Sequence, residues 1–381
     1  MRVLHLASFE GNIGDIANHE GLYLHLKELL QCDFEVEQLS FRLFYKNNQQ
    51  KKFDKGFVEH ANSYDLLIIG GGNFFELCWD YSATGTTFDI TNELLKLIST
   101  PILIMGIGID IDKGYSENNI RKFNSFLQTL FSSNKVFFTV RNDGSKNVVN
   151  RFFGQYRNNI HVIPDHGFYI ADVLDSKGTE SNSLPKYIGI NVTSDLREVR
   201  YKNIEYEKFI KELAVVVNHI LDIYDVDVYL FPHIPSDYQA IVDLMKHLNN
   251  YYVRTRVSVA PLQIGNELEL FKLYKKCKLI VGMRAHLSIC TVGLGVPSFA
   301  MSSYTKPEYI YNEIGLEDRY LNIRENNFFN ELRKEIESNL TDEHYNAEIS
   351  KRYLGILSEL KKQRNEVYQL LNNWFQENGL K

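Results

Sequence analysis

Cysteine is scarce in this sequence of 381 residues, and its four copies lie far apart. No CxxC pair is present, so the sequence predicts neither a disulfide framework nor a zinc site built on cysteine. Histidines and carboxylates also lack a metal-ligand spacing such as HExxH. We therefore expect no metal and no cofactor, and we expect a reducing, cytoplasmic setting.

The sequence also lacks an excess of positive charge and a long apolar segment. It has 42 Lys and Arg against 48 Asp and Glu, a net charge of -6, which argues against a nucleic-acid-binding protein. No apolar run approaches the ~20 residues of a membrane span, and residues 1–8 are wrongly flanked for a signal peptide. The composition, 44% hydrophobic and 24% charged, is instead typical of a folded globular protein with room for two domains.

Short apolar segments alternate with helical patterns along most of the chain, which predicts mostly parallel sheets. The expected strands of the first half are 3–7, 35–39, 66–69, 102–105, 136–140 and 161–163, and those of the second half are 187–191, 226–231, 279–281 and 298–300. Helical patterns cover 18–30 and 118–131, and apolar residues recur at helical spacing in the charged tail from Phe328. The tail therefore predicts one or two C-terminal helices packed on the body.

A polar stretch at 175–183 separates the two series of strands and is typical of a linker. We expect an N-terminal α/β domain over 1–175, a C-terminal α/β domain over 184–325, and C-terminal helices over 326–381. The fold class is therefore α/β, with two open, mostly parallel α/β domains facing a cleft.

The most informative stretch is 282–286, Gly-Met-Arg-Ala-His, directly after the apolar segment 278–281. That segment is typical of a buried parallel strand, and open α/β sheets bind ligands at the carboxyl ends of their strands. The guanidinium of Arg284 suits a carboxylate or phosphate, and His286 suits proton transfer near neutral pH. A buried ion pair and a core histidine are the alternatives. Two polar residues between apolar segments favour an anionic substrate site.

Three glycine-containing loops follow expected strands of the first half. Their sequences are Gly11-Asn12-Ile13-Gly14-Asp15, Gly70-Gly71-Gly72-Asn73 and Gly106-Ile107-Gly108-Ile109-Asp110. Glycines let backbone N–H groups approach a ligand, although none of the loops is a Walker or GxGxxG motif. Asp15 either caps a helix or holds a substrate hydroxyl. Because the loops follow successive strands, we expect them to line a common cleft.

Four further polar residues end expected strands. They are Arg141, Asp165, His166 and His233. Arg141 at a strand end suits an anion, while Asp165 and His166 either relay protons or form a turn. His233 either contacts a phosphate or sugar hydroxyl or is a partly buried histidine between two prolines.

Taken together, these residues resemble the polysaccharide pyruvyl transferase family over about residues 1–305. The resemblance rests on the three glycine loops, Val140-Arg141-Asn142-Asp143, Pro164-Asp165 and the stretch 282–286. Family members often have Arg-Leu-His where this sequence has Arg284-Ala285-His286, and an Asp-Pro-Ala type segment is replaced at 164–168. The arginine and histidine are retained, whereas the changed loop near His166 leaves the acceptor open.

The resemblance implies a fold like that of GT-B glycosyltransferases, phosphoenolpyruvate as the donor and a sugar hydroxyl pair as the acceptor. The product would be a pyruvate ketal on a cell-surface polysaccharide or its precursor. Arg284, Arg141 and His233 would bind the donor, with Arg284 and His286 as the catalytic pair and His286 as the general acid. The acceptor side would comprise Asn12, Asp15, Gly71, Gly72, Asn73, Asp165 and His166. A lipid-linked acceptor would bring the protein to the inner membrane face.

Two other classes of function remain open from the sequence. The first is a GT-B-type glycosyltransferase or sugar epimerase that uses a nucleotide-sugar, because one fold hosts many chemistries. The second is a non-catalytic sugar- or anion-binding protein, against which the retained Arg284 and His286 argue. The sequence does not indicate an oligomeric state.

Overall fold

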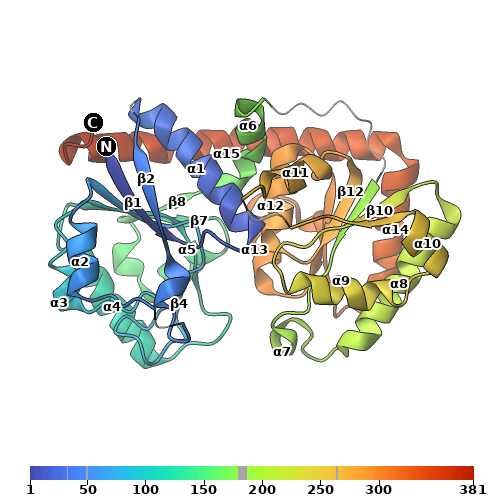
Figure 1. The fold of residues 1–381 in the computed structure, drawn as a ribbon, viewed down its shortest axis with the longest axis horizontal. Helices are drawn as coiled ribbons and strands as arrows, with labels where there is room; N and C mark the ends of the chain where they lie inside the picture. The colour runs from blue at the N-terminus through green and yellow to red at the C-terminus, as the bar shows by residue number, and fades with distance from the viewer. Residues whose placement is uncertain (32, 49, 179–186, 263–264) are drawn as a thin grey trace. The chain divides into compact units, whose positions relative to one another are not determined.

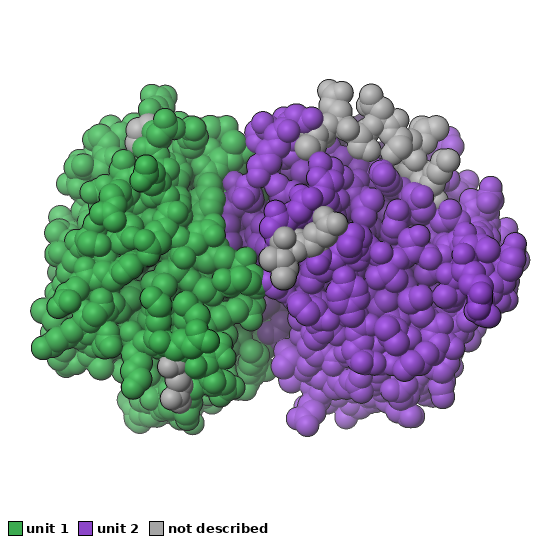
Figure 2. All heavy atoms as spheres, in the orientation of Figure 1, with its two compact units in different colours: residues 1–10, 22–166, 360–381 green, residues 11–21, 167–359 purple. Residues whose placement is uncertain are grey.

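The computed structural model describes residues 1–381 except 32, 49, 179–186 and 263–264. Two compact units, each discontinuous in sequence, make up the chain: unit 1 comprises residues 1–10, 22–166 and 360–381, and unit 2 comprises residues 11–21 and 167–359 (Figure 2). The expected linker at 175–183 lies partly outside the described residues. The domain boundaries at 175, 184 and 326 therefore stay predictions.

Unit 1 is built on a six-stranded parallel sheet with the strand order β2-β1-β3-β5-β7-β8. Its strands are β1 (Arg2–Ala7), β2 (Glu35–Ser40), β3 (Leu66–Gly70), β5 (Ile102–Ile107), β7 (Val136–Arg141) and β8 (Ile160–Ile163). β3 and β5 are buried along their whole length, which is why their sequences are continuously apolar. A second, two-stranded parallel ladder pairs β4 (Phe75–Glu76) with β6 (Ile109–Asp110).

Helices cover this sheet and bury two apolar layers against it (Figure 1). They are the second half of α1 (Ile13–Leu30), α2 (Lys55–Ala61), α3 (Asn92–Leu95), α4 (Glu117–Leu130) and α5 (Ser145–Phe152), with the short helices η1 (Phe41–Phe44) and η2 (Gly154–Tyr156). Ser116 caps the beginning of α4, because its hydroxyl accepts a hydrogen bond from the Asn119 N–H. The expected helix at 118–131 is thus confirmed.

Unit 2 repeats the plan with the strand order β11-β10-β9-β12-β13-β14, again entirely parallel. Its strands are β9 (Tyr187–Asn191), β10 (Asp227–Leu230), β11 (Val257–Val259), β12 (Cys277–Gly282), β13 (Ser298–Ser302) and β14 (Tyr320–Asn322). The four strands expected in the second half are confirmed as β9, β10, β12 and β13. The sequence analysis missed β11 and β14, which lie at the two edges and have only three residues each.

Unit 2 has one further apolar core and a set of helices of its own. They are the first half of α1, α6 (Ile170–Ser176), α7 (Arg197–Arg200), α8 (Tyr206–Ile223), α9 (Asp237–Met245), α10 (Asn250–Thr255), α11 (Leu268–Tyr274), α12 (Ala285–Leu294), α13 (Thr305–Glu313) and α14 (Phe328–Thr341), with η4 (Glu317–Arg319). The short helix η3 (His166–Tyr169) begins at the last residue of unit 1.

The charged tail forms two helices, α14 and the 35-residue α15 (Glu343–Glu377), as expected. α14 packs on α8 and β12 with Phe328, Leu332 and Ile336 in the core of unit 2. α15 contributes Tyr353 to the buried residues of unit 2 and, beyond Leu360, Trp374 and other residues to the core of unit 1. Among the described residues, no helix is long and apolar enough to cross a membrane.

Candidate functional site

Arg284 lies at the topological switch point of the unit 2 sheet. From β9 the chain first adds β10 and β11 on one side and then returns to add β12, β13 and β14 on the other. Gly282, the last residue of β12, pairs with Asn191 at the end of β9. Crevices at such a reversal are the usual ligand sites of open α/β sheets, and Arg284 follows there as the residue before α12.

The guanidinium of Arg284 is held by the loop after β9 and by the first residue of α9. Its Nη1 donates to Oδ2 of Asp195 at 3.0 Å, and its Nη2 donates to Oγ1 of Thr193 at 2.7 Å and to Asp237. Its Nε donates to the second oxygen of Asp237 at 3.3 Å. Burial opposes the charge, but Asp237 and Asp195 outweigh it and raise the pKa of Arg284. The arginine is therefore a fixed cation.

The two carboxylates that hold Arg284 have different surroundings. Asp237 is fully buried and also accepts hydrogen bonds from the N–H groups of His233 and Ile234. Asp195 retains 24% of its side-chain exposure and shares its other oxygen with Nε of Arg200 at 3.0 Å. Burial favours the neutral acid, but Arg284 and Arg200 outweigh burial and lower the pKa of Asp195. We call Arg284, Arg200, Thr193, Asp195 and Asp237 the Arg284 cluster.

Two histidines lie beside this cluster in unit 2. His233 is buried, and its Nε2 forms a hydrogen bond with the hydroxyl of Tyr274. Burial, with the nearby Arg284 and His286, lowers the pKa of His233 well below its ordinary value. His286 lies in the first turn of α12, is partly exposed, and packs against Gly14.

The first glycine loop belongs to unit 2, because the beginning of α1 packs beside these histidines. The Ile13 N–H donates to the backbone oxygen of His233 at 3.2 Å. Within the loop, Asn12 accepts from the Gly14 N–H at 3.0 Å and donates to Asp15 at 3.1 Å. Asn12 and Asp15, expected on the acceptor side, thus lie in the same unit as Arg284 and His286.

Unit 1 holds the second strand-end arginine. Arg141 at the end of β7 donates from Nε to Asp143 at 2.7 Å and from Nη1 to Asp165 at 3.3 Å. Asp143 and Asp165 retain only 3% and 1% of their side-chain exposure. Asn142 accepts from the Asp165 N–H. We call Arg141, Asp143 and Asp165 the Arg141 cluster.

The other two glycine loops lie together in unit 1 at the carboxyl ends of β3 and β5. The Gly71 N–H donates to Met105, and the Gly108 N–H donates to Gly72 at 2.9 Å. Asn73 donates from its amide to Glu76 at 2.9 Å and to Asp110 at 2.5 Å. The two loops are therefore hydrogen-bonded to each other, and the amide of Asn73 contacts the carboxylates of Glu76 and Asp110.

His166 follows β8 in unit 1 and is fully buried. Its Nε2 forms a 2.9 Å hydrogen bond with the hydroxyl of Tyr368 on α15, and its ring lies beside His25. Its neighbour Asp165 belongs to the Arg141 cluster. The two residues of this expected turn therefore have different partners.

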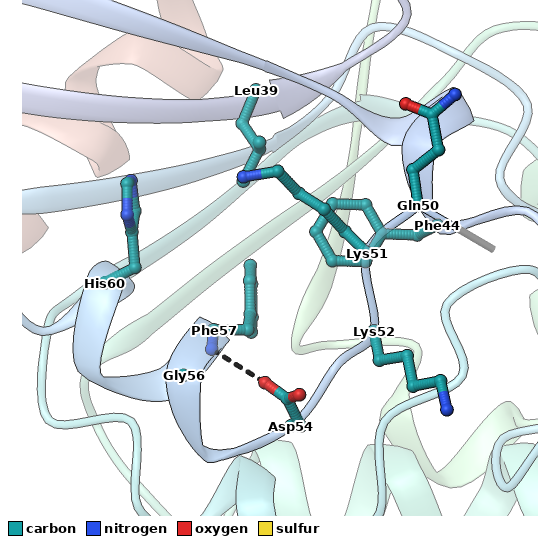
Figure 3. Close-up of a pocket in the computed structure, with 9 residues that line it drawn as sticks. All are labelled: Leu39, Phe44, Gln50, Lys51, Lys52, Asp54, Gly56, Phe57 and His60. Carbon is teal, nitrogen blue, oxygen red and sulfur yellow. Dashed lines mark hydrogen bonds between the residues drawn. The ribbon is translucent and has the colours of Figure 1, made fainter.

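A cavity of about 420 Å³ lies apart from the strand-end residues, between β2 and α2 in unit 1 (Figure 3). It is lined by Leu39, Phe44, Gln50, Lys51, Lys52, Asp54, Gly56, Phe57 and His60. Asp54 caps α2 by accepting from the Phe57 N–H at 3.1 Å, the dashed line in Figure 3. Every residue singled out from the sequence lies outside this cavity.

Four members of the Arg284 cluster were not predicted from the sequence: Thr193, Asp195, Arg200 and Asp237. The signal for three of them was present, because Thr193 and Asp195 follow β9 and Asp237 follows β10 just as Arg284 follows β12. In unit 1, Glu76 was not predicted, and Asp110 was named only as the last residue of a glycine loop; the two residues pair in the short ladder of β4 and β6. Among the described residues, no group of three or more His, Cys, Asp or Glu is arranged to hold a metal ion.

A comparison with models of protein families identifies the family of the chain. A model of the polysaccharide pyruvyl transferase family matches residues 12–304. The chain belongs to this family. The matched region includes both arginine clusters, His286 and the three glycine loops except Gly11, so the resemblance drawn from those motifs is confirmed. No curated protein matches the sequence significantly.

Solved structures confirm the fold class as GT-B-like. UDP-GlcNAc 2-epimerase from Methanocaldococcus jannaschii is 14% identical, with a TM-score of 0.56 over 90% of this chain and 94% of that one. The S. aureus MnaA–UDP structure is 13% identical, with a TM-score of 0.57 over 100% and 97%. Anabaena HepE with UDP and glucose is 14% identical, with a TM-score of 0.54 over 98% and 100%. At these identities the likeness concerns the fold alone.

Proposed function

We propose that the protein transfers the pyruvate unit of phosphoenolpyruvate onto two hydroxyls of one sugar, forming a pyruvate ketal and releasing phosphate. The acceptor is a cell-surface polysaccharide or its precursor. One observation carries the proposal: in a chain of the polysaccharide pyruvyl transferase family, Arg284 and His286 lie two residues apart at the switch point of unit 2. The pair combines an anion-binding group with a proton-transfer group.

Arg284 binds an acidic group of the donor in this proposal, with Arg141 and His233 as the further donor residues. Phosphoenolpyruvate carries a carboxylate and a phosphate, and bidentate arginine contacts fix the orientation of such groups. Asp237 is buried and has several donors of its own, so it keeps Arg284 in place. Asp195 is the more exposed partner, and a donor oxygen takes its position on Nη1.

His286 in its imidazolium form donates a proton to the methylene carbon of phosphoenolpyruvate, which becomes a methyl group. The adjacent carbon acquires oxocarbenium character, and a sugar hydroxyl adds to it and loses its proton to neutral His286. The bond from that carbon to the phosphate oxygen then breaks. The second hydroxyl adds to the same carbon and gives up its proton to the departed phosphate, so the products are the ketal and hydrogen phosphate.

The acceptor-side residues are proposed from their positions in the two units. Asn12 and Asp15 are supported by their place in the loop that packs beside His233 and His286. Gly71, Gly72, Asn73, Asp165 and His166 are supported by their position at strand ends of unit 1. Carboxylates and amides are suitable partners for sugar hydroxyls.

The deciding experiment compares donor candidates by thermal unfolding of the purified protein. A ligand at ~100 times its Kd adds about 2.7 kcal/mol to the stability of the folded state. We expect phosphoenolpyruvate to raise the Tm of wild type but not of Arg284→Ala. Arg352→Ala is the matched control, because Arg352 pairs with Asp318 on the surface of unit 2, and it should behave like wild type.

Stabilisation by UDP- or GDP-sugars and not by phosphoenolpyruvate would contradict the proposal and favour a nucleotide-sugar enzyme. Release of inorganic phosphate from phosphoenolpyruvate, dependent on a sugar acceptor, provides the second measurement. Donor binding without phosphate release across a panel of acceptor glycans would favour a binding protein.

A further inference from the structure

Gly14 occupies a position where the side chain of His286 leaves no room for another residue. It lies in the first turn of α1, and a Cβ atom added there would fall within 3.0 Å of Cβ, Cγ and Nδ1 of His286. Real Cβ atoms essentially never approach other atoms so closely. The clash involves the root of the histidine side chain, so a rotation of the imidazole ring about Cβ–Cγ cannot relieve it.

The other glycine of the same loop has a different requirement. Gly11 adopts φ +72°, which favours glycine, but a Cβ added there would meet only Pro235 at an ordinary 3.8 Å. Gly14 has no positive φ. The loop therefore needs Gly11 for its backbone conformation and Gly14 for its close approach to His286.

The first turn of α1 is anchored and cannot easily move away from His286. The Ile13 N–H is bound by the backbone oxygen of His233. Asn12 connects the Gly14 N–H to the carboxylate of Asp15. Both His233 and His286 belong to unit 2 together with this turn, so the contact lies within one compact unit.

We propose that Gly14 is a positioning residue, whose bare backbone is the surface against which His286 is held in one orientation. The proposal rests on the proposed function, because it gives Gly14 a role through the proton-transfer group. Proton transfer requires the donor nitrogen at hydrogen-bond distance from the reacting carbon, and a displacement of 1 Å costs about 10²-fold in rate. A side chain at position 14 would cause such a displacement.

The test compares Gly14→Ala with Gly355→Ala, a helical glycine of α15 with no atom within 4 Å of an added Cβ. We expect kcat of Gly14→Ala to fall about 10²-fold, with the Kd for phosphoenolpyruvate within about threefold of wild type, because Arg284 is untouched. Gly355→Ala should keep wild-type kcat. Normal kcat in Gly14→Ala would overturn the proposal, as would an equal loss in Gly355→Ala.

Imidazole NMR gives a readout that does not depend on turnover. The His286 ring resonances of isotope-labelled protein are assigned by their loss in His286→Ala. We expect them to shift in Gly14→Ala and to stay in place in Gly355→Ala. Unshifted resonances would overturn the inference even if the proposed function holds. Shifted resonances in a protein that releases no phosphate from phosphoenolpyruvate would support the contact and reject the function.

A stability cycle covers the case in which Gly14→Ala folds poorly. Alanine is a better helix former than glycine, so helix propensity alone predicts stabilisation by this change. We expect urea unfolding to show destabilisation in the wild-type background and none in His286→Gly, where Cβ, Cγ and Nδ1 are removed. Equal destabilisation in both backgrounds would overturn the inference.

Discussion

Each unit ends a central strand with an arginine held by two carboxylates, but only one of the two clusters has a partner that faces solvent. In unit 1, Asp143 and Asp165 are almost completely buried around Arg141. In unit 2, Asp195 is 24% exposed and is shared by Arg284 and Arg200. The Arg141 cluster has one cation and two anions. The Arg284 cluster has two cations, Arg284 and Arg200, and two anions.

The difference indicates how each cluster would respond to an anionic ligand. An added anion has to compete with two buried carboxylates at Arg141, and separating a buried carboxylate from its cation is costly. At Arg284 the anion takes the place of Asp195, which is already partly exposed, and the positive charge of Arg200 also attracts the anion. We therefore expect donor affinity to depend more on Arg284 than on Arg141.

The sharpest contrast should come from the histidine next to each cluster. We expect His286→Ala to lower kcat by ~10²–10⁴-fold, the usual contribution of a positioned acid–base group, with phosphoenolpyruvate affinity largely kept. The matched variant His166→Ala loses a buried hydrogen bond to Tyr368 and should lower stability more than turnover of the folded enzyme. Steady-state kinetics and thermal unfolding check both. A near-normal kcat in His286→Ala would contradict its role.

The second contrast concerns stability. Arg141→Met leaves two buried carboxylates without their cation, and removal of one partner of a buried ion pair costs about 3–5 kcal/mol. Arg284→Met should cost clearly less, because Asp195 is partly exposed and keeps its ion pair with Arg200. Urea unfolding of the two variants measures the difference. Equal losses would show that exposure of Asp195 does not distinguish the clusters.

The central strands were predictable because they are buried on both faces and read as short continuous apolar segments. β9 was predicted to the residue, and β3 and β5 differ only at their ends. β11 and β14 escaped because three partly exposed residues at a sheet edge carry no periodic signal. Strand order is set by packing between distant segments, which no local pattern records.

The candidate site was predictable where polar residues at the carboxyl ends of strands were taken as ligand-binding residues. Arg284 and Arg141 were found in this way, but Asp195 and Asp237 were not, although they follow neighbouring strands. The first glycine loop was expected beside the other two, since it also follows a strand of the first sheet. Its grouping with unit 2 depends on the contacts of Ile13 with His233 and of Gly14 with His286, which are long-range.

A third test changes Asp195, the partly exposed partner of Arg284. Asp195→Asn removes the charge that competes for Nη1 of Arg284 while keeping a similar shape. We expect phosphoenolpyruvate to bind about tenfold more tightly, equivalent to ~1.4 kcal/mol. Asp165→Asn in the Arg141 cluster is the matched control and should not tighten binding. Isothermal titration measures both, and weaker binding in Asp195→Asn would mean that Asp195 serves only to orient Arg284.

The comparison extends to pH through His25, which lies beside His166 in unit 1. Burial, with the positive fields of His166, Arg364 and Lys361, lowers the pKa of His25 to about 2. The unfolded chain takes up a proton on this residue near pH 6.5 and the folded protein does not, so acidification below that pH favours unfolding. At pH 5.5 this one group lowers the free energy of unfolding by about 1.4 kcal/mol relative to pH 7.5.

Urea unfolding checks this pH dependence. The free energy of unfolding of His25→Gln should fall by that much less than wild type between pH 7.5 and 5.5. His344→Gln, at an exposed histidine of α15, should match wild type. An unchanged loss in His25→Gln would mean that His25 is protonated in the folded protein.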